Sequence, residues 1–213
     1  MDRKANRLVF VDVETIGTIK NPRVIQIAAI ATNEFAEELA GFEAKALLPA
    51  GSKAKPRHSR YDAKLWKAEA NTAQQVAIDF AAFLTRNSTV ERYAKSGQMF
   101  RVAQLVAHNA EFDTQVLRNW YARLGIYLPA AYQPLCTMQR ALWMFQDRRR
   151  FPRPSDYRLT KLCKYSEIEH SPKQAHDAFA DVRAMLLLYR RMIATDQLSS
   201  IDESSVIKKV ACG

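Results

Sequence analysis

The sequence contains little cysteine and little glycine. Its three cysteines, Cys136, Cys163 and Cys212, form no Cys-x-x-Cys pair, which argues against a zinc finger or a disulfide framework and suits a reducing compartment. The six glycines include no glycine-rich phosphate loop. No apolar run approaches the roughly 18 residues that a membrane span needs, and the first residues show no signal-peptide pattern. We therefore expect a cytoplasmic protein that does not enter a membrane.

Acidic residues are also in the minority. Lysine and arginine number 32 against 22 aspartates and glutamates, which gives a net charge of +10 and a pI near 9.6. An excess of positive charge of this size indicates a polyanionic partner, nucleic acid before membrane. With 213 residues, of which 48% are hydrophobic, the chain has the length and composition of one ordinary globular domain.

A short apolar run near the N-terminus ends in two carboxylates. Residues 8–13 are nearly all hydrophobic, which is typical of a strand buried on both faces of a sheet. Asp12 and Glu14 lie two residues apart, so in a strand their side chains project from the same face. Two such carboxylates repel each other and lose hydration, a cost that a bound cation would offset. A bare Asp-x-Glu also fits a solvated strand end that leads into a turn at Gly17, so the remaining ligands must come from elsewhere in the chain.

The next segments indicate further strands, a basic stretch and a helix. We expect a second strand at residues 24–32 and a third within residues 39–48. The short connections predict that these strands form an antiparallel meander with the first. Residues 51–67 are rich in lysine and arginine, with aromatic residues such as Trp66 between them, which fits either a nucleic-acid contact or a solvated loop. Residues 72–85 predict a helix that begins with the capping-box spacing of Thr72 and Gln75. Its apolar positions are Val76, Ile78, Phe80, Phe83 and Leu84.

A second strand-to-helix junction carries another acid. Residues 105–107 predict a short buried strand, and Asn109 suits the N-cap of the helix that follows. Asp113 lies in the first turn on the side of the helix that faces the core, where an acid either complements the helix dipole or serves as a ligand. Taken alone, it is interpreted as complementing the dipole. The apolar stripe of this helix is Phe112, Val116, Trp120 and Leu124.

The last helix presents an acid on its apolar face, which consists of Ala178, Val182, Met185, Tyr189 and Met192. Asp181 falls on this face, and a carboxylate without a partner there would be strongly destabilising, so we expect it to be paired with a cation. His176 lies five residues earlier and can share a site with Asp181 only from the preceding turn, although a helix-capping role is an alternative. Taken alone, the other histidines are interpreted as structural or surface residues: His58, His108 and His170.

The remaining segments complete a single domain, residues 1–194, followed by a tail. A short segment at residues 135–137 leads into a helix through Phe145, and another helix spans residues 159–165. Between them, residues 148–154 form a second basic loop with two prolines, for which phosphate binding is favoured. Residues 195–213 are polar, and we expect them to form a loosely attached C-terminal tail.

Three acidic motifs in this order resemble the DEDDh family of 3′→5′ exonucleases. The matching stretches are residues 10–15 (FVDVET), 106–113 (VAHNAEFD) and 176–181 (HDAFAD), with smaller matches at residues 136–137 and 159–162. The resemblance covers roughly residues 7–193 and departs at residues 15–17, where the family often has a second threonine. Gln26 also stands where the family commonly has an acid.

The resemblance implies a ribonuclease-H-like α/β fold, with a five-stranded mixed sheet of three antiparallel strands and then two parallel strands, flanked by helices. It implies that two Mg²⁺ or Mn²⁺ ions are bound by the carboxylates of Asp12, Glu14, Asp113 and Asp181. His176 would take the proton from the attacking water. The residues expected to contact the substrate are Thr15, Ile16, His108, Asn109, Arg148, Arg149 and Arg150.

The predicted function is therefore that of a 3′→5′ exonuclease that releases nucleoside 5′-monophosphates from single-stranded 3′ ends, of DNA before RNA. The alternative is a nucleic-acid-binding subunit or scaffold that kept the fold within a larger replication, repair or RNA-processing assembly. The complete set of four acids and His176 argues against this alternative. The resemblance leaves open whether the protein forms a homodimer or works with a polymerase or repair partner.

Overall fold

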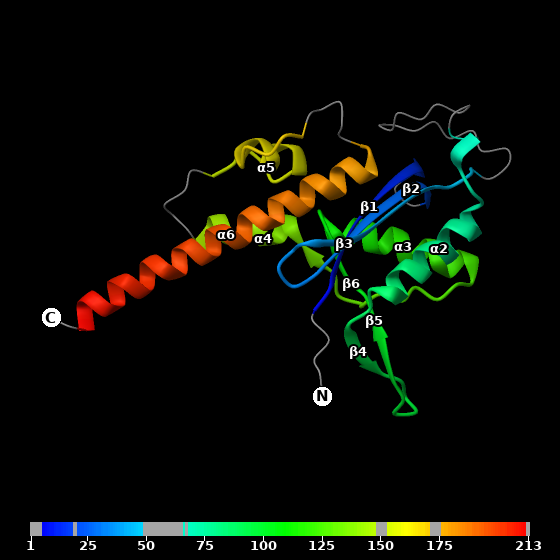
Figure 1. Ribbon diagram of the computed structural model, residues 1–213. Helices are drawn as coiled ribbons and strands as arrows, with labels where there is room; N and C mark the ends of the chain where they lie inside the picture. Colours follow the sequence, from blue (N-terminus) through cyan, green and yellow to red (C-terminus); the bar gives the residue numbers. More distant parts are fainter. Residues whose placement is uncertain are drawn as a thin grey trace.

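A mixed five-stranded sheet forms the centre of the protein (Figure 1). The computed structural model describes residues 6–18, 21–48, 66, 68–147, 153–170 and 176–211, with the backbone alone at residue 147 and beyond residue 196. The strand order is β3-β2-β1-β6-β7. Strands β1 (Leu8–Thr18), β2 (Asn21–Thr32) and β3 (Glu38–Lys45) pair antiparallel. Strands β6 (Gln104–Ala107) and β7 (Leu135–Cys136) then add in parallel, which confirms the predicted sheet.

Helices cover both faces of this sheet because β1 is apolar on both sides. Val9, Val11 and Val13 pack with α2 (Ala73–Arg86) and α3 (Ala110–Leu124) in one core cluster. Phe10 faces the other way and packs against the start of α6 (Ala178–Ala211). Helices α4 (Thr137–Asp147) and α5 (Leu159–Tyr165) join α6 in a smaller cluster on its side of the molecule (Figure 1).

Two apolar residues that the helical patterns assigned to the core are exposed. Ile78 in α2 is 45% exposed, and Phe112 in α3 is 40% exposed. In α3 the predicted positions Val116 and Trp120 are buried, and Asp113 is buried on the core-facing side, as expected. The acid, and not the aromatic ring before it, therefore faces the sheet. Thr72 does cap α2, since its side-chain oxygen accepts the N–H of Gln75 at 3.1 Å.

Trp66 does not belong to an exposed nucleic-acid surface, contrary to the interpretation of residues 51–67. Its ring is 7% exposed and packs with Ile16 and Ile25, and its Nε1–H donates to the carbonyl of Ala46 at 3.3 Å. The apolar area of the ring outweighs the charge of the segment around it. The rest of the predicted basic stretch lies outside the described residues.

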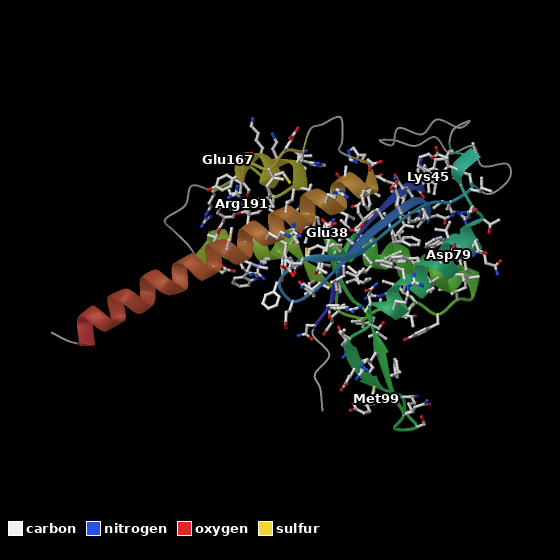
Figure 2. The ribbon with its side chains drawn as sticks, viewed as in Figure 1. Glu38, Lys45, Asp79, Met99, Glu167 and Arg191 are labelled. Carbon is white, nitrogen blue, oxygen red and sulfur yellow. The ribbon has the colours of Figure 1, made fainter. Side chains whose placement is uncertain are left out.

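A β-hairpin that the sequence did not predict stands away from the sheet (Figures 1 and 2). It consists of β4 (Val90–Tyr93) and β5 (Met99–Val102), which pair antiparallel. Only its base is buried, at Val102, while Tyr93 and Met99 are exposed. The alternation of apolar and polar residues is therefore weak, and the pattern gives little sign of a strand.

Helix α6 is longer than expected and continues through most of the predicted tail. It runs to Ala211, and Figure 1 shows its C-terminal part extending away from the sheet. Residues 195–211 of the predicted tail are thus helical, and no glycine or proline interrupts the helix there. The division of the chain at residue 194 stays a prediction. Within the described parts of the chain, no helix combines the length and the apolar character needed to cross a membrane.

Candidate active site

Three segments with acidic side chains meet at one end of the sheet. Strands β1 and β6 run in the same direction, with Phe10 opposite Val106, so the residues that follow them come to the same edge. Asp12 and Glu14 continue β1, and α3 begins just after β6 and carries Asp113. Helix α6 packs on the same face as Phe10 and brings its first turn to this edge. Residues about 170 positions apart in the chain can therefore act together.

Asp12 and Glu14 lie on the face of β1 that α6 covers, as their two-residue spacing predicts. Val11 and Val13 point to the opposite face and are buried in the larger core cluster. The pairing of β1 with β2 shifts its register between Glu14 and Thr15. Such an irregularity re-aims side chains and is common beside functional sites. Both carboxylates are partly buried, so neither is free to move into bulk water.

Asp113 is almost completely buried, with 3% of its surface exposed. Its Oδ1 accepts the backbone N–H of Val13 at 3.4 Å, which ties the first turn of α3 to β1 between the two other acids. A residue that served only the helix dipole would gain as much at the surface. Its burial beside the other carboxylates favours the second of the two roles left open by the sequence, that of a ligand.

His176 and Asp181 are joined at the start of α6. The backbone N–H of His176 donates to Oδ2 of Asp181 at 3.2 Å, and His176 itself has a left-handed backbone with φ of 70°. The imidazole is about half exposed, and its Nδ1 lies 3.8 Å from Oε1 of Glu14. One potential ligand atom from each of Glu14, His176 and Asp181 lies within 4.8 Å of the others. The structure thus brings together the residues that the sequence placed far apart.

Burial and mutual repulsion hold protons on these carboxyl groups. Burial, followed by the charges of Asp181 and Asp177, raises the pKa of Glu14 to about 7. Burial raises the pKa of Asp113 to about 8, and the charges of Glu14 and Asp181 act in the same direction. Burial, then the charges of Asp113, Asp181, Glu14 and Asp177, raises the pKa of Asp12 well above its ordinary value. The cluster is therefore electrostatically unfavourable by itself.

The donor set fits a divalent cation. Mg²⁺ and Mn²⁺ prefer carboxylate oxygens, and the four acids offer these from three segments. Oδ1 of Asp181 is buried and makes no aligned hydrogen bond among the described residues. A buried oxygen of this kind can serve as a ligand of a cation. A cation would also relieve the repulsion that raises the pKa values of Asp12, Glu14 and Asp113.

The unfolding of the metal-free protein should depend on pH in an unusual direction. Because the pKa values of Glu14 and Asp113 are raised to about 7 and about 8, the folded protein binds more protons than the unfolded chain between pH ~4 and pH ~8. Their contribution to stability is complete below pH ~4 and is lost as the pH rises through these values. Thermal unfolding in chelator should show this loss as a lower unfolding midpoint. In a chain of this size, the midpoint falls by about 2–4 °C for each kcal/mol lost from the free energy of unfolding.

Asp113→Asn is the matched variant for this experiment. It keeps the size of the side chain and removes the charge, so it should be more stable than the wild type at pH ~8 in chelator and equal to it at low pH. Addition of Mn²⁺ at pH ~8 should raise the unfolding midpoint of the wild type alone, because binding to the folded state stabilises it. An identical pH dependence in both proteins would contradict the raised pKa of Asp113.

His108 and Asn109 are close to the site, but their own contacts are internal. The Nε2–H of His108 donates to the carbonyl of Tyr157 at 2.8 Å, and its Nδ1 lies 2.9 Å from the hydroxyl of Thr137. These contacts tie β6 to α4 and to the segment before α5, and burial lowers the pKa of His108. Asn109 occupies the predicted N-cap position but has φ of 62° and makes no capping bond with its side chain. Their contact with substrate stays a prediction.

The other predicted substrate contacts are distributed unevenly. Thr15 is partly buried at the edge of the site, whereas Ile16 is 2% exposed and packs with Ile25, so the apolar core holds its side chain. Arg148, Arg149 and Arg150 lie outside the described residues. The structure therefore places only Thr15 of this group near the carboxylates with a partly accessible side chain.

Three residues of the site had been missed as contributors. Asp177 caps α6 by accepting the N–H of Ala180 at 3.0 Å, and its other oxygen accepts from Nε2 of Gln26 at 3.4 Å. Gln26, where the family commonly has an acid, is 3% exposed and is paired with Glu14 across the strands. His170, interpreted from the sequence as a structural or surface residue, is buried and lies 2.9 Å from Asp181. Of these three residues, only Gln26 could have been found from the sequence, because a meander of the first two strands places it opposite Glu14.

The chain belongs to an exonuclease family. The family model RNase_T, described as exonuclease, matches residues 9–189, which include all four acids and His176. The family suggested by the three motifs is thereby confirmed. A comparison with curated proteins finds no match.

Solved structures of exonuclease I share this fold. The zinc-bound complex of E. coli exonuclease I with single-stranded DNA is 21% identical, with a TM-score of 0.71, and the match covers 94% of this chain and 43% of that one. The complex of the same enzyme with a dA16 oligonucleotide is 22% identical, with a TM-score of 0.70 over 93% and 42%. A structure of SSB/exonuclease I with the inhibitor CFAM is 20% identical, with a TM-score of 0.67 over 88% and 41%. This chain spans less than half the length of these proteins.

Proposed function

We propose that this chain hydrolyses phosphodiester bonds at the 3′ ends of nucleic acids and releases nucleoside 5′-monophosphates, with two Mg²⁺ or Mn²⁺ ions as cofactors. Single-stranded DNA is the proposed substrate, before RNA. The observation that carries the proposal is the convergence of four carboxylates and His176 at the edge of the sheet, in a member of an exonuclease family. The choice of DNA is supported by the oligonucleotide complexes of exonuclease I.

The four acids would hold the cations from two sides. Such ions supply neutralisation of the charge on the attacking and leaving oxygens. Asp12 is the central ligand of this proposal, because the charges of Asp113, Asp181 and Glu14 all raise its pKa. Asp113 is held against β1 by the N–H of Val13, so its carboxylate keeps a fixed orientation.

His176 would accept the proton of the attacking water. Its imidazole is about half exposed, whereas the acids are buried or partly buried, so the ring occupies the open side of the site. The backbone of the same residue is tied to Asp181, which keeps the ring within a few ångströms of Glu14. A general base needs both access to the water and a fixed position, and the exposure of the ring and the backbone bond to Asp181 support these two requirements.

Product ladders from end-labelled oligonucleotides test the proposal. With Mg²⁺, a strand labelled at its 5′ end should shorten in single-nucleotide steps, and phosphorothioate linkages at the 3′ terminus should stop the reaction, as should excess chelator. Single-stranded DNA, duplex DNA and RNA in parallel define the substrate. Internal cuts or shortening from the 5′ end would contradict the proposal. Strand binding without any cleavage, in Mg²⁺ or Mn²⁺, would favour the nucleic-acid-binding subunit instead.

The basic loop at residues 148–154 should contact the phosphates of the bound strand. Replacing Arg148, Arg149 and Arg150 together with alanine should flatten the dependence of log K on log salt by about 2, since each phosphate contact on a single strand contributes about 0.7. Binding of a DNA oligomer measured at several salt concentrations, in chelator to prevent cleavage, gives the slope. An unchanged slope would show that these arginines do not touch the backbone.

A matched control removes three cations elsewhere. Arg86 at the end of α2 and Arg92 and Lys95 of the hairpin are exposed, and the hairpin stands away from the sheet. Alanine at these positions lowers the net charge by the same amount, so it should weaken binding only through the general field and leave the slope close to that of the wild type.

A further inference from the structure

His170 lies against the carboxylate of Asp181. Its Nε2 is 2.9 Å from Oδ1, and the two side chains are 2% and 14% exposed. The other oxygen, Oδ2, accepts the backbone N–H of His176 at 3.2 Å. Each oxygen of Asp181 therefore faces one nitrogen, and the two nitrogens come from different segments of the chain.

Among the described residues, neither His170 nor Asp181 has another hydrogen-bond partner for the two atoms that face each other. Nε2 of His170 and Oδ1 of Asp181 are both buried, and neither has an aligned hydrogen bond with any group of the described residues. A buried polar atom without a partner is costly, and at 2.9 Å a small rotation of the ring or the carboxylate aligns these two. His170 is therefore the group placed to donate to Oδ1 of Asp181, and a carboxylate oxygen that accepts one hydrogen bond keeps a second lone pair for a cation.

The segment that carries His170 is anchored on α5. The N–H of Ile168 donates to the carbonyl of Cys163 at 2.8 Å, and the side chain of Ile168 packs in the cluster shared by α4, α5 and α6. His170 thus approaches Asp181 from the side of α5, while His176 approaches it from the start of α6. A carboxylate held from two independent directions has a defined orientation.

We propose that His170 is a positioning residue whose Nε2–H donates to Oδ1 of Asp181 and keeps this carboxylate turned toward Glu14 and His176. The inference rests on the proposed function, because a cation site is what requires Asp181 in one orientation. The ring of His170 is 2% exposed, so it touches neither the strand nor the attacking water. Its role is separate from that of His176, whose ring is about half exposed. Groups that orient a ligand in this way are typically worth about 10–100-fold in metal affinity.

Mn²⁺ binding by the full chain, measured by calorimetry without nucleic acid, tests this role independently of turnover. His170→Leu removes the donor at similar size, and we expect the Kd for Mn²⁺ to rise by about 10–100-fold. His170→Gln retains an N–H donor at the end of the side chain, and it should recover most of the lost affinity. With substrate, His170→Leu should lower kcat and leave KM for the strand nearly unchanged, because no contact with the strand is removed.

Ile168→Ala is the structural control. It loosens the same segment by removing apolar packing, so it should lower the unfolding midpoint while Mn²⁺ affinity stays near that of the wild type. Wild-type affinity in His170→Leu would overturn the role of His170 and leave the proposed function intact. Equal losses in His170→Gln and His170→Leu would overturn the donor role. Absence of Mn²⁺ binding by the wild type would overturn both the inference and the cation site.

The tautomer of His170 provides a second test, which can be made on the folded wild-type protein. Long-range ¹H–¹⁵N spectra of the wild-type protein distinguish a proton on Nε2 from one on Nδ1. The proposal requires the proton on Nε2, and the signal should shift in Asp181→Asn, which changes the acceptor alone. A ring protonated only at Nδ1 could not donate to Asp181 and would overturn the proposal.

Discussion

Asp12→Asn should leave a folded protein that no longer shortens a nucleic-acid strand. Asp12 lies among the carboxylates of Asp113, Asp181 and Glu14, all of which raise its pKa together with burial. Asparagine keeps the shape and removes one of the four negative charges that offset two dications. The rate should fall by more than the about 100-fold expected for a residue that only orients a ligand. We expect the same result for Asp181→Asn, which also removes the negative charge from the group that accepts the N–H of His176.

The folded state of these variants is part of the expected result. Removal of one charge relieves repulsion inside the cluster, so Asp12→Asn should unfold at a higher temperature than the wild type in chelator near neutral pH. Asp79→Asn makes the same chemical change at an exposed position on α2 (Figure 2), where the acid accepts a hydrogen bond from Gln75, and it should change neither the rate nor the unfolding midpoint. Substantial turnover in Asp12→Asn, or in excess chelator, would contradict the assignment of these acids to a cation site.

The local part of this site follows from residue spacing. The two-residue interval between Asp12 and Glu14 fixes a common face once the segment is a strand, and the apolar run of residues 8–13 makes it a strand. The short connections among the first three strands predict their antiparallel order, and the structure confirms it. Asp181 is identified in the same way, because an acid on the apolar face of a helix needs a partner.

Contacts between distant segments do not follow from spacing. His170 and Asp181 are separated by residues for which the sequence has no periodic pattern, and only the packing of α5 against α6 brings them together. The exposure of Phe112 beside the buried Asp113 also does not follow from the helical pattern, since the hydrogen bond from the N–H of Val13 to Asp113 joins two distant segments. Trp66 was assigned to a surface by the charges beside it, although its own apolar area decides its place.

Regular structure was also missed where burial is slight. The β4–β5 hairpin buries only its base, so its strands lack the alternation that identifies a strand. The extension of α6 to Ala211 is polar, and the composition of residues 195–213 therefore suggested a tail. Composition indicates how much apolar surface a segment can bury. A helix that has already formed in the packed part of α6 can continue into a polar segment, because extending a helix is easier than starting one.

Replacement of His176 should reduce the rate of hydrolysis by about 10²–10⁴-fold, the usual contribution of a general base. The left-handed backbone of this residue, with φ of 70°, decides which variants are informative, since alanine is found in this conformation less often than histidine or asparagine. Asparagine tolerates this conformation and glycine adopts it freely, so His176→Asn and His176→Gly remove the imidazole without disturbing the N–H that binds Asp181. Single-turnover rates with a DNA oligomer and Mg²⁺ measure the loss.

The decisive measurement is the restoration of activity by added imidazole. A pH–rate profile also reports the binding of the cation, because protons on Glu14 and Asp113, whose pKa values are raised in the metal-free protein, compete with it, so the profile does not isolate His176. In His176→Gly the exposed position of the missing ring leaves room for free imidazole, which should recover part of the rate in proportion to its concentration. Mn²⁺ affinity should stay near that of the wild type, because the four carboxylates are unchanged. A large loss of Mn²⁺ affinity, without rescue, would show that His176 is instead a ligand of the cation, as its position within 4.8 Å of Glu14 and Asp181 also permits.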